Sequence, residues 1–105
     1  MTRTEAIRQV LENLRVIDAQ ANPAAEDANV VGKRLDQARA FLIERGLCWW
    51  TADAIPDAVS SAFCAFVAER TGDVFNKPYS APGAIKDIAS VKSGEDREAV
   101  KTEYF

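Results

Sequence analysis

The stretch from Asn22 to Gly46, NPAAEDANVVGKRLDQARAFLIERG, decides the fold of this chain. Its apolar residues recur at steps of three and four, which is the spacing of one face of an α-helix. Asn22 can cap a first turn, Pro23 fits the first helical position, and Gly46 supplies a left-handed stop. We therefore expect a central helix of about 23 residues, roughly 35 Å long at 1.5 Å per residue. Its apolar face comprises Ala28, Val31, Leu35, Ala38, Phe41 and Leu42.

A second helix is expected before this stretch. Thr2 and Glu5 have the spacing of a capping box, and an apolar stripe follows them. The stripe ends near Arg15–Asp18, and the polar connector that leads to Asn22 is short. A short connection between helices favours antiparallel neighbours, so the sequence predicts a helical hairpin. The members of the stripe are Ala6, Ile7, Val10, Leu11, Leu14 and Ile17.

A third helix is expected to begin near Ile55-Pro56-Asp57, because the residue before a proline is biased out of the helical region. Arg70 and Gly72 mark its end. Between the central helix and the third helix lie two adjacent tryptophans, which cannot both point into one core from a regular element. We expect one of Trp49 and Trp50 to plug the core and the other to mark an interface.

The character of the chain changes at residue 76. Residues 77–83 form a turn-rich linker, residues 84–91 suit a short helix or an extended piece, and residues 95–105 are charged. The sequence thus predicts an all-α fold: a small bundle of three main helices, an antiparallel hairpin plus a third helix, with an extended C-terminal arm. Residues 1–75 would be the helical body, and residues 76–105 the linker and the arm that docks on a partner.

Composition limits the possible functions. With 105 residues, 48% hydrophobic and 28% charged, the chain is typical of one soluble globular domain. Its net charge of −3 lacks the basic excess of a free-standing nucleic-acid binder, so any DNA contact should be local or shared among several copies. No apolar run approaches the ~20 residues that span a bilayer, and Met1–Glu5 leads into an amphipathic helix without an export signal. We expect a protein made in the cytoplasm, with no membrane partner.

Patterns for catalysis or cofactor binding are not found in the sequence. The chain has no His, which excludes Ser-His-Asp and Cys-His nucleophiles and the usual zinc sites. It has no glycine-rich phosphate loop. Cys48 and Cys64 are expected to behave as small buried apolar residues. The sequence predicts no enzyme activity, no metal and no cofactor.

The order of these elements resembles the head-to-tail adaptor proteins of tailed phages, in particular the tail accessory or packaged-DNA-stabilisation group. The matching features lie within residues 2–75. They are Val10-Leu11 and Leu14 before the Val16-Ile17-Asp18 turn, Ala21-Asn-Pro23-Ala-Ala-Glu26-Asp27-Ala28, the Leu35…Leu42 helix that ends at Arg45-Gly46, a Trp-bearing loop, and Ile55-Pro56-Asp57.

This resemblance implies a virion protein of the head–tail neck, present as a ring, usually of twelve copies, that docks under the portal protein. Such a ring extends the DNA channel, helps to retain packaged DNA, which passes through without sequence-specific binding, and gives a tail or stopper protein a platform. The C-terminal segment of the family engages the portal or a neighbouring subunit, and residues 79–105 match its position.

Candidate partner-binding residues follow from the exposed-tryptophan argument and from the arm. They are Trp49, Trp50, Tyr79, Ile85, Ile88, Val91, Val100, Tyr104 and Phe105. The alternative interpretation is a small helical protein-interaction module, or a helix-turn-helix regulator. The acidic helix starts at Glu26-Asp27 and Asp57 suit a DNA reader poorly, because a recognition helix carries polar or basic residues there.

Overall fold

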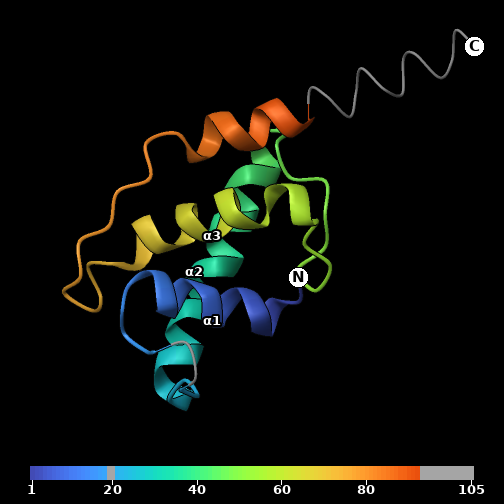
Figure 1. Cartoon of the computed structure of the whole chain (residues 1–105). Helices are drawn as coiled ribbons and strands as arrows, with labels where there is room; N and C mark the ends of the chain where they lie inside the picture. Colours follow the sequence, from blue (N-terminus) through green and yellow to red (C-terminus); the bar gives the residue numbers. More distant parts are fainter. Residues whose placement is uncertain (19–20, 93–105) are drawn as a thin grey trace, which may run out of the picture.

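The computed structural model describes residues 1–18 and 21–92 of the chain, and this part is all-helical, as predicted (Figure 1). Helix α1 spans Arg3–Asn13, α2 spans Ala25–Glu44 and α3 spans Asp57–Thr71. A further helix covers residues 84–92. The described residues contain no strand, only an isolated antiparallel bridge between Thr51 and Ala54.

The helices are arranged around α3. Figure 1 shows α1 and α3 side by side, α2 crossing behind both, and the helix of residues 84–92 along the other side of α3. The predicted antiparallel hairpin is not confirmed, because α2 crosses α1 instead of running back along it. The connection is also longer than the sequence suggested, since α1 ends at Asn13 and α2 begins at Ala25, and a long connection does not impose an antiparallel neighbour.

Helix α1 begins as the sequence predicts. The backbone N–H of Glu5 donates to Thr2 Oγ1 at 3.2 Å, and the backbone N–H of Thr2 donates to Glu5 Oε1 at 3.1 Å. These reciprocal bonds satisfy two donors that the helix itself cannot, and they hold the pKa of the Glu5 carboxyl below its ordinary value.

Helix α2 begins two residues later than predicted. Its N-cap is Ala24, in an extended conformation and without a side-chain cap, so the expectation of an Asn22 cap with Pro23 as the first helical residue is wrong. Glu26 and Asp27 do lie in the first turn, where negative charge interacts favourably with the helix dipole. The apolar periodicity therefore located the helix, while the capping residues misplaced its start.

The helix ends use left-handed residues to redirect the chain. Gly46, with φ of 71°, follows α2, and the N–H groups of Gly46 and Leu47 donate to the carbonyls of Ile43 and Leu42 at 3.0 and 2.9 Å. This pair of bonds is a Schellman motif. Arg15, with φ of 59°, ends α1 through an equivalent pair of bonds, although a side chain is strained in this conformation.

Helix α3 ends where the sequence predicts, with Arg70 in its last turn and Gly72 as its C-cap, but the left-handed residue lies elsewhere. Gly72 is right-handed, and the left-handed residue is Asn76, with φ of 54°. The N–H of Lys77 donates to the carbonyl of Gly72 at 2.8 Å, which closes an additional turn after the helix. A methyl group at position 72 would overlap the Lys77 carbonyl oxygen, so glycine is required there for space and not for its freedom at positive φ.

The core joins all four helices. Phe63 is its largest fully buried side chain, and Thr71 is the one buried polar residue among those described. Thr71 satisfies its hydroxyl by donating to the Val67 carbonyl at 2.6 Å. The core residues are Ala6, Ile7, Val10, Leu11, Leu14, Val31, Leu35, Ala38, Leu42, Trp50, Ile55, Val59, Phe63, Cys64, Phe66, Val67, Ala68, Ala84 and Ile88.

Residues 84–92 extend this core. Ala84 and Ile88, one helical turn apart, are both buried in it. A three-helix body whose extended arm starts at residue 76 is therefore not confirmed, because the chain returns along α3 after the linker. Residues 93–105, which the sequence assigned to the rest of the arm, lie outside the described part of the chain.

Substitutions at the two left-handed residues Arg15 and Gly46 should change the stability of the fold in opposite directions. Arg15→Gly should stabilise the fold by about 1 kcal/mol, because it removes a side chain from a conformation that costs 1–2 kcal/mol, although glycine also frees the unfolded chain. Gly46→Ala should destabilise by a similar amount, since no neighbouring atom lies within 4 Å of an added Cβ and only the backbone conformation opposes it. Urea unfolding followed by circular dichroism measures both. Equal stabilities for the two variants would contradict this assignment.

Candidate functional site

The loop between α2 and α3 is fixed by an arginine from α2. Arg39 Nε and Nη2 donate to the Trp50 carbonyl oxygen at 3.1 and 2.9 Å, and Cys48 Sγ lies 3.5 Å from the same oxygen. The planar guanidinium suits this two-donor contact. Arg39 is half-buried on α2. Its contact positions both tryptophans.

The two tryptophans divide as the sequence predicts, one in the core and one partly at the surface. The Trp50 ring packs edge-to-face against Phe63, with ring centroids 5.4 Å apart, and is only 4% exposed. Its indole N–H has no acceptor among the described residues. Trp49 packs edge-to-face on Trp50 at 4.9 Å and is half-buried. Lys92 Nζ lies 5.8 Å from the Trp49 ring centroid, so the loop meets the end of the last described helix.

The predicted partner-binding residues fall into four groups: exposed, partly buried, buried, and outside the described residues. Ile85 is exposed, at 39%, while Tyr79 and Val91 are partly buried against the core. Ile88 is 0% exposed and Trp50 is 4% exposed. The prediction that these two residues bind a partner is therefore wrong, because their side chains belong to the core and not to the surface. Val100, Tyr104 and Phe105 lie outside the described residues.

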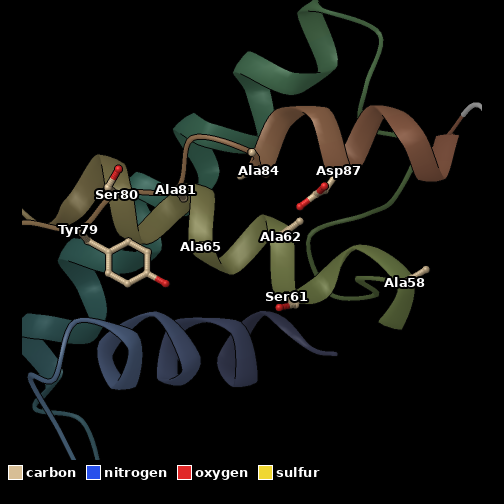
Figure 2. A pocket seen from close by; sticks show the side chains of 10 residues that line it. Ala58, Ser61, Ala62, Ala65, Tyr79, Ser80, Ala81, Ala84 and Asp87 are labelled. Atoms are coloured by element: carbon tan, nitrogen blue, oxygen red, sulfur yellow. The ribbon is translucent and has the colours of Figure 1, made fainter.

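A shallow groove runs between α3 and the segment of residues 79–87 (Figure 2). Its volume is about 390 Å³. In Figure 2 the Asp87 side chain points toward Ala62, and the Tyr79 ring lies along α3 near Ala65. The α3 side is built from Ala58, Ser61, Ala62 and Ala65, and small side chains allow a second chain to approach a helix backbone closely. The groove is a place for packing rather than for chemistry, since it holds one carboxylate and no basic residue.

Four predicted partner-binding residues, Trp49, Tyr79, Ile85 and Val91, are at least partly exposed, and we refer to them and to this groove as the outer face. Its residues come from the α2–α3 loop, the linker and the helix of residues 84–92, which packs on the core and brings Lys92 to Trp49. The sequence found these four residues by their apolar character. It did not show that residues 84–92 would bring them onto the folded body.

The described residues offer no metal site, because no group of three or more Cys, Asp or Glu side chains could hold an ion. No described helix has the length and apolar character needed to cross a membrane.

The two cysteines differ in burial. Cys64 is buried, with its sulfur 3.7 Å from the Met1 sulfur, while Cys48 is half-buried. The sequence predicted that both cysteines are buried; this is wrong for Cys48, which is partly exposed.

Two arginines that the sequence placed at helix ends share one aromatic ring. The guanidinium carbons of Arg45 and Arg70 lie 4.3 and 4.8 Å from the centroid of Phe41. Phe41 in turn packs on Phe66, with centroids 5.9 Å apart. Phe41 and Arg45 are four residues apart and so lie on one face of the helix, which means that their contact could have been predicted from the sequence. The contribution of Arg70 depends on how α3 meets α2 and could not be read.

Arg39 should matter for stability because it ties the loop to α2. Arg39→Met should lower the free energy of unfolding by about 1–3 kcal/mol, since hydrogen bonds to a charged group are lost and the Trp50 carbonyl is left without them. Arg39→Lys keeps the positive charge but not the two parallel N–H donors, so its free energy of unfolding should lie between those of the unchanged chain and Arg39→Met. Urea unfolding monitored by tryptophan fluorescence tests this, and an unchanged midpoint for Arg39→Met would contradict the role of the contact.

Burial raises the pKa of the Cys64 thiol to about 11. Because this pKa exceeds the unfolded value of 9.0, the unfolded chain loses its proton first as the pH rises. The Cys64 contribution to stability is therefore complete below pH 9 and is lost between about pH 9 and 11. Cys64→Ala should show a shallower loss of stability over this pH range than the unchanged chain.

The two cysteines should also differ in their reaction with a thiol reagent at pH 8. The reagent should label Cys48 in the native protein and both cysteines in denaturant. Rapid labelling of Cys64 in the native protein would contradict its burial.

Comparison of the chain with protein-family models, curated proteins and solved structures finds no match.

Proposed function

We propose that this chain is a subunit of a head-to-tail adaptor ring of a tailed phage or phage-like particle. It would dock under the portal protein, extend the DNA channel, help to retain packaged DNA and offer the tail a platform. The role is structural and not catalytic. The proposal rests on the resemblance carried by residues 2–75 and on one structural observation, the outer face.

The outer face supports the proposal because it offers apolar contact area where a neighbour could pack. Trp49 and Tyr79 present partly exposed aromatic rings, and Ile85 is one of the three most exposed large apolar residues among those described. Aromatic residues are enriched in protein interfaces, and the groove beside them has small side chains on its α3 wall. Residues 93–105, the remaining part of the proposed arm, continue from the helix that carries this face.

The arrangement of the helices counts against the helix-turn-helix alternative. That motif joins two helices by a turn of about three or four residues. The connections Asn13 to Ala25, Glu44 to Asp57 and Thr71 to residue 84 are all longer among the described elements. A protein-interaction module that uses the same outer face remains the second candidate, and it differs from the adaptor only in its partner.

Native mass spectrometry of the full chain with the portal ring of the same particle tests the adaptor role. We expect several copies of the chain to bind each portal ring and to form a closed ring upon it. A chain that stays monomeric or dimeric and ignores the portal would contradict the adaptor role. The interaction-module candidate predicts that second result.

Matched isoleucine variants test whether the outer face makes the contact. Ile85→Ser should reduce incorporation at least tenfold, because it removes an exposed apolar side chain from that face. Ile43→Ser removes the same atoms from a side chain that is 47% exposed on α2 and should leave incorporation unchanged. Equal effects of the two substitutions would contradict the assignment of the face.

A truncation separates the face from the arm. The cut should follow Lys92, because removal of residues 84–92 would also remove Ala84 and Ile88 from the core. The truncated protein should keep its helical circular dichroism and its thermal midpoint. If it also joins the portal ring as efficiently as the full chain, the proposal that residues 93–105 anchor the subunit is wrong.

A further inference from the structure

The helix of residues 84–92, which we call the strap, is held on α3 by few buried side chains. Of its nine residues, Ala84 and Ile88 are buried, and the other seven are exposed or half-buried. Helix α3, along which the strap lies in Figure 1, buries seven of its 15 residues. Isolated helices shorter than about 12 residues are marginal in water, so the strap depends on its two buried side chains to remain helical.

The strap also fits α3 incompletely. The groove of about 390 Å³ lies between them, with Ala58, Ala62 and Ala65 on the α3 side. Atoms that face such a space have no partner across it and lose the attraction that close packing gives. In Figure 2 the carboxylate of Asp87 points toward Ala62, and a carboxylate gains no stability from losing water against a methyl group. The strap and α3 therefore pack closely along part of their contact and not along all of it.

Both ends of the strap are held by contacts that water can weaken. The preceding linker, residues 72–83, contains turns but no helix or strand. The Ala81 N–H of this linker donates to Glu69 Oε2 of α3 at 2.6 Å, and the bond is exposed to solvent, where water competes for both groups. At the other end, Lys92 Nζ lies 5.8 Å from the Trp49 ring centroid, a distance at which an exposed cation–π contact is weak.

The body formed by α1, α2 and α3 has its own packing. Each of these helices contacts both of the others. Phe63 of α3, the largest fully buried side chain, also packs on Trp50 of the α2–α3 loop. An element with few buried apolar contacts opens at a lower free energy than the core to which it is attached. The body can therefore remain folded when the strap leaves it.

We infer that the strap is a conformational switch: it undocks from α3 while the body stays folded, and the outer face is complete when it is docked. Ile85 and Val91 of the outer face lie on the strap, and Ala84 and Asp87 line one side of the groove. Undocking removes these two apolar residues and that side of the groove together. A partner that binds the complete face selects the docked form. That a partner binds there rests on the proposed function; the undocking does not.

Native-state hydrogen exchange of the full chain, followed by nuclear magnetic resonance in urea concentrations below the unfolding transition, tests the switch. The amides of residues 88–91, inside the strap, should exchange at least tenfold faster than the slowest amides of α3. Their rates should also depend less on urea, because undocking exposes less surface than unfolding. Strap amides with the rate and the urea dependence of the slowest α3 amides would overturn the switch.

Two substitutions of buried isoleucines separate undocking from unfolding. Ile88→Ala removes the main anchor of the strap, and Ile7→Ala removes the same atoms from α1, where the side chain is 7% exposed. The slowest α3 amides should exchange faster in both variants, because both destabilise the native state. The strap amides should exchange at least tenfold faster in Ile88→Ala and at an unchanged rate in Ile7→Ala. Equal acceleration of the strap amides, or loss of the whole fold in Ile88→Ala, would mean that the strap opens only with the body and would overturn the switch.

These measurements use the free chain, so they are independent of the portal experiment. If the chain ignores the portal while the strap amides respond to Ile88→Ala alone, the switch is supported and the adaptor role fails. If the chain forms a ring on the portal while the strap amides exchange together with those of α3, the adaptor role is supported and the switch fails.

Discussion

The described fold depends on the contacts of Trp50, in the loop between α2 and α3, with Arg39 of α2 and Phe63 of α3. Trp50 fills the core against Phe63, and Arg39 binds the Trp50 carbonyl with two donors, so one residue connects the loop to both helices. Met1 is fixed nearby, because the Ile55 N–H donates to its carbonyl at 2.9 Å. These contacts therefore add to the direct packing of α3 on α1 and α2 in the shared core.

Sequence periodicity was enough to predict the elements that carry their own signals. The Thr2–Glu5 capping box and the Gly46 stop are local, and both are present as expected. The Asn22-Pro23 signal was misleading because capping residues mark where a helix can begin, whereas packing decides where it does. α2 begins without a side-chain cap at Ala24, and its buried face supplies the stability that the cap does not.

Tertiary contacts explain what the sequence could not supply. Residues 84–91 carry Ile85, Ile88 and Val91, a spacing too short and too weak to decide between a docked helix and an extended arm. The decision depends on Ala84 and Ile88 meeting a core formed by residues far away in the chain. The candidate site shows the same division: Trp49 and Ile85 were identifiable as apolar, while the Arg39 and Arg70 contacts arise only from the way helices meet.

The edge-to-face contact between Trp49 and Trp50 also gives the protein an optical signature. Two indoles held 4.9 Å apart at 88° couple their excited states, which produces a paired band in circular dichroism that a single tryptophan cannot give. The coupling depends on the loop geometry, so the band disappears when the loop opens, even if the helices remain. Since Lys92 lies beside Trp49, docking of the last described helix should alter the same band. The chain therefore carries an intrinsic, label-free sensor of its own loop.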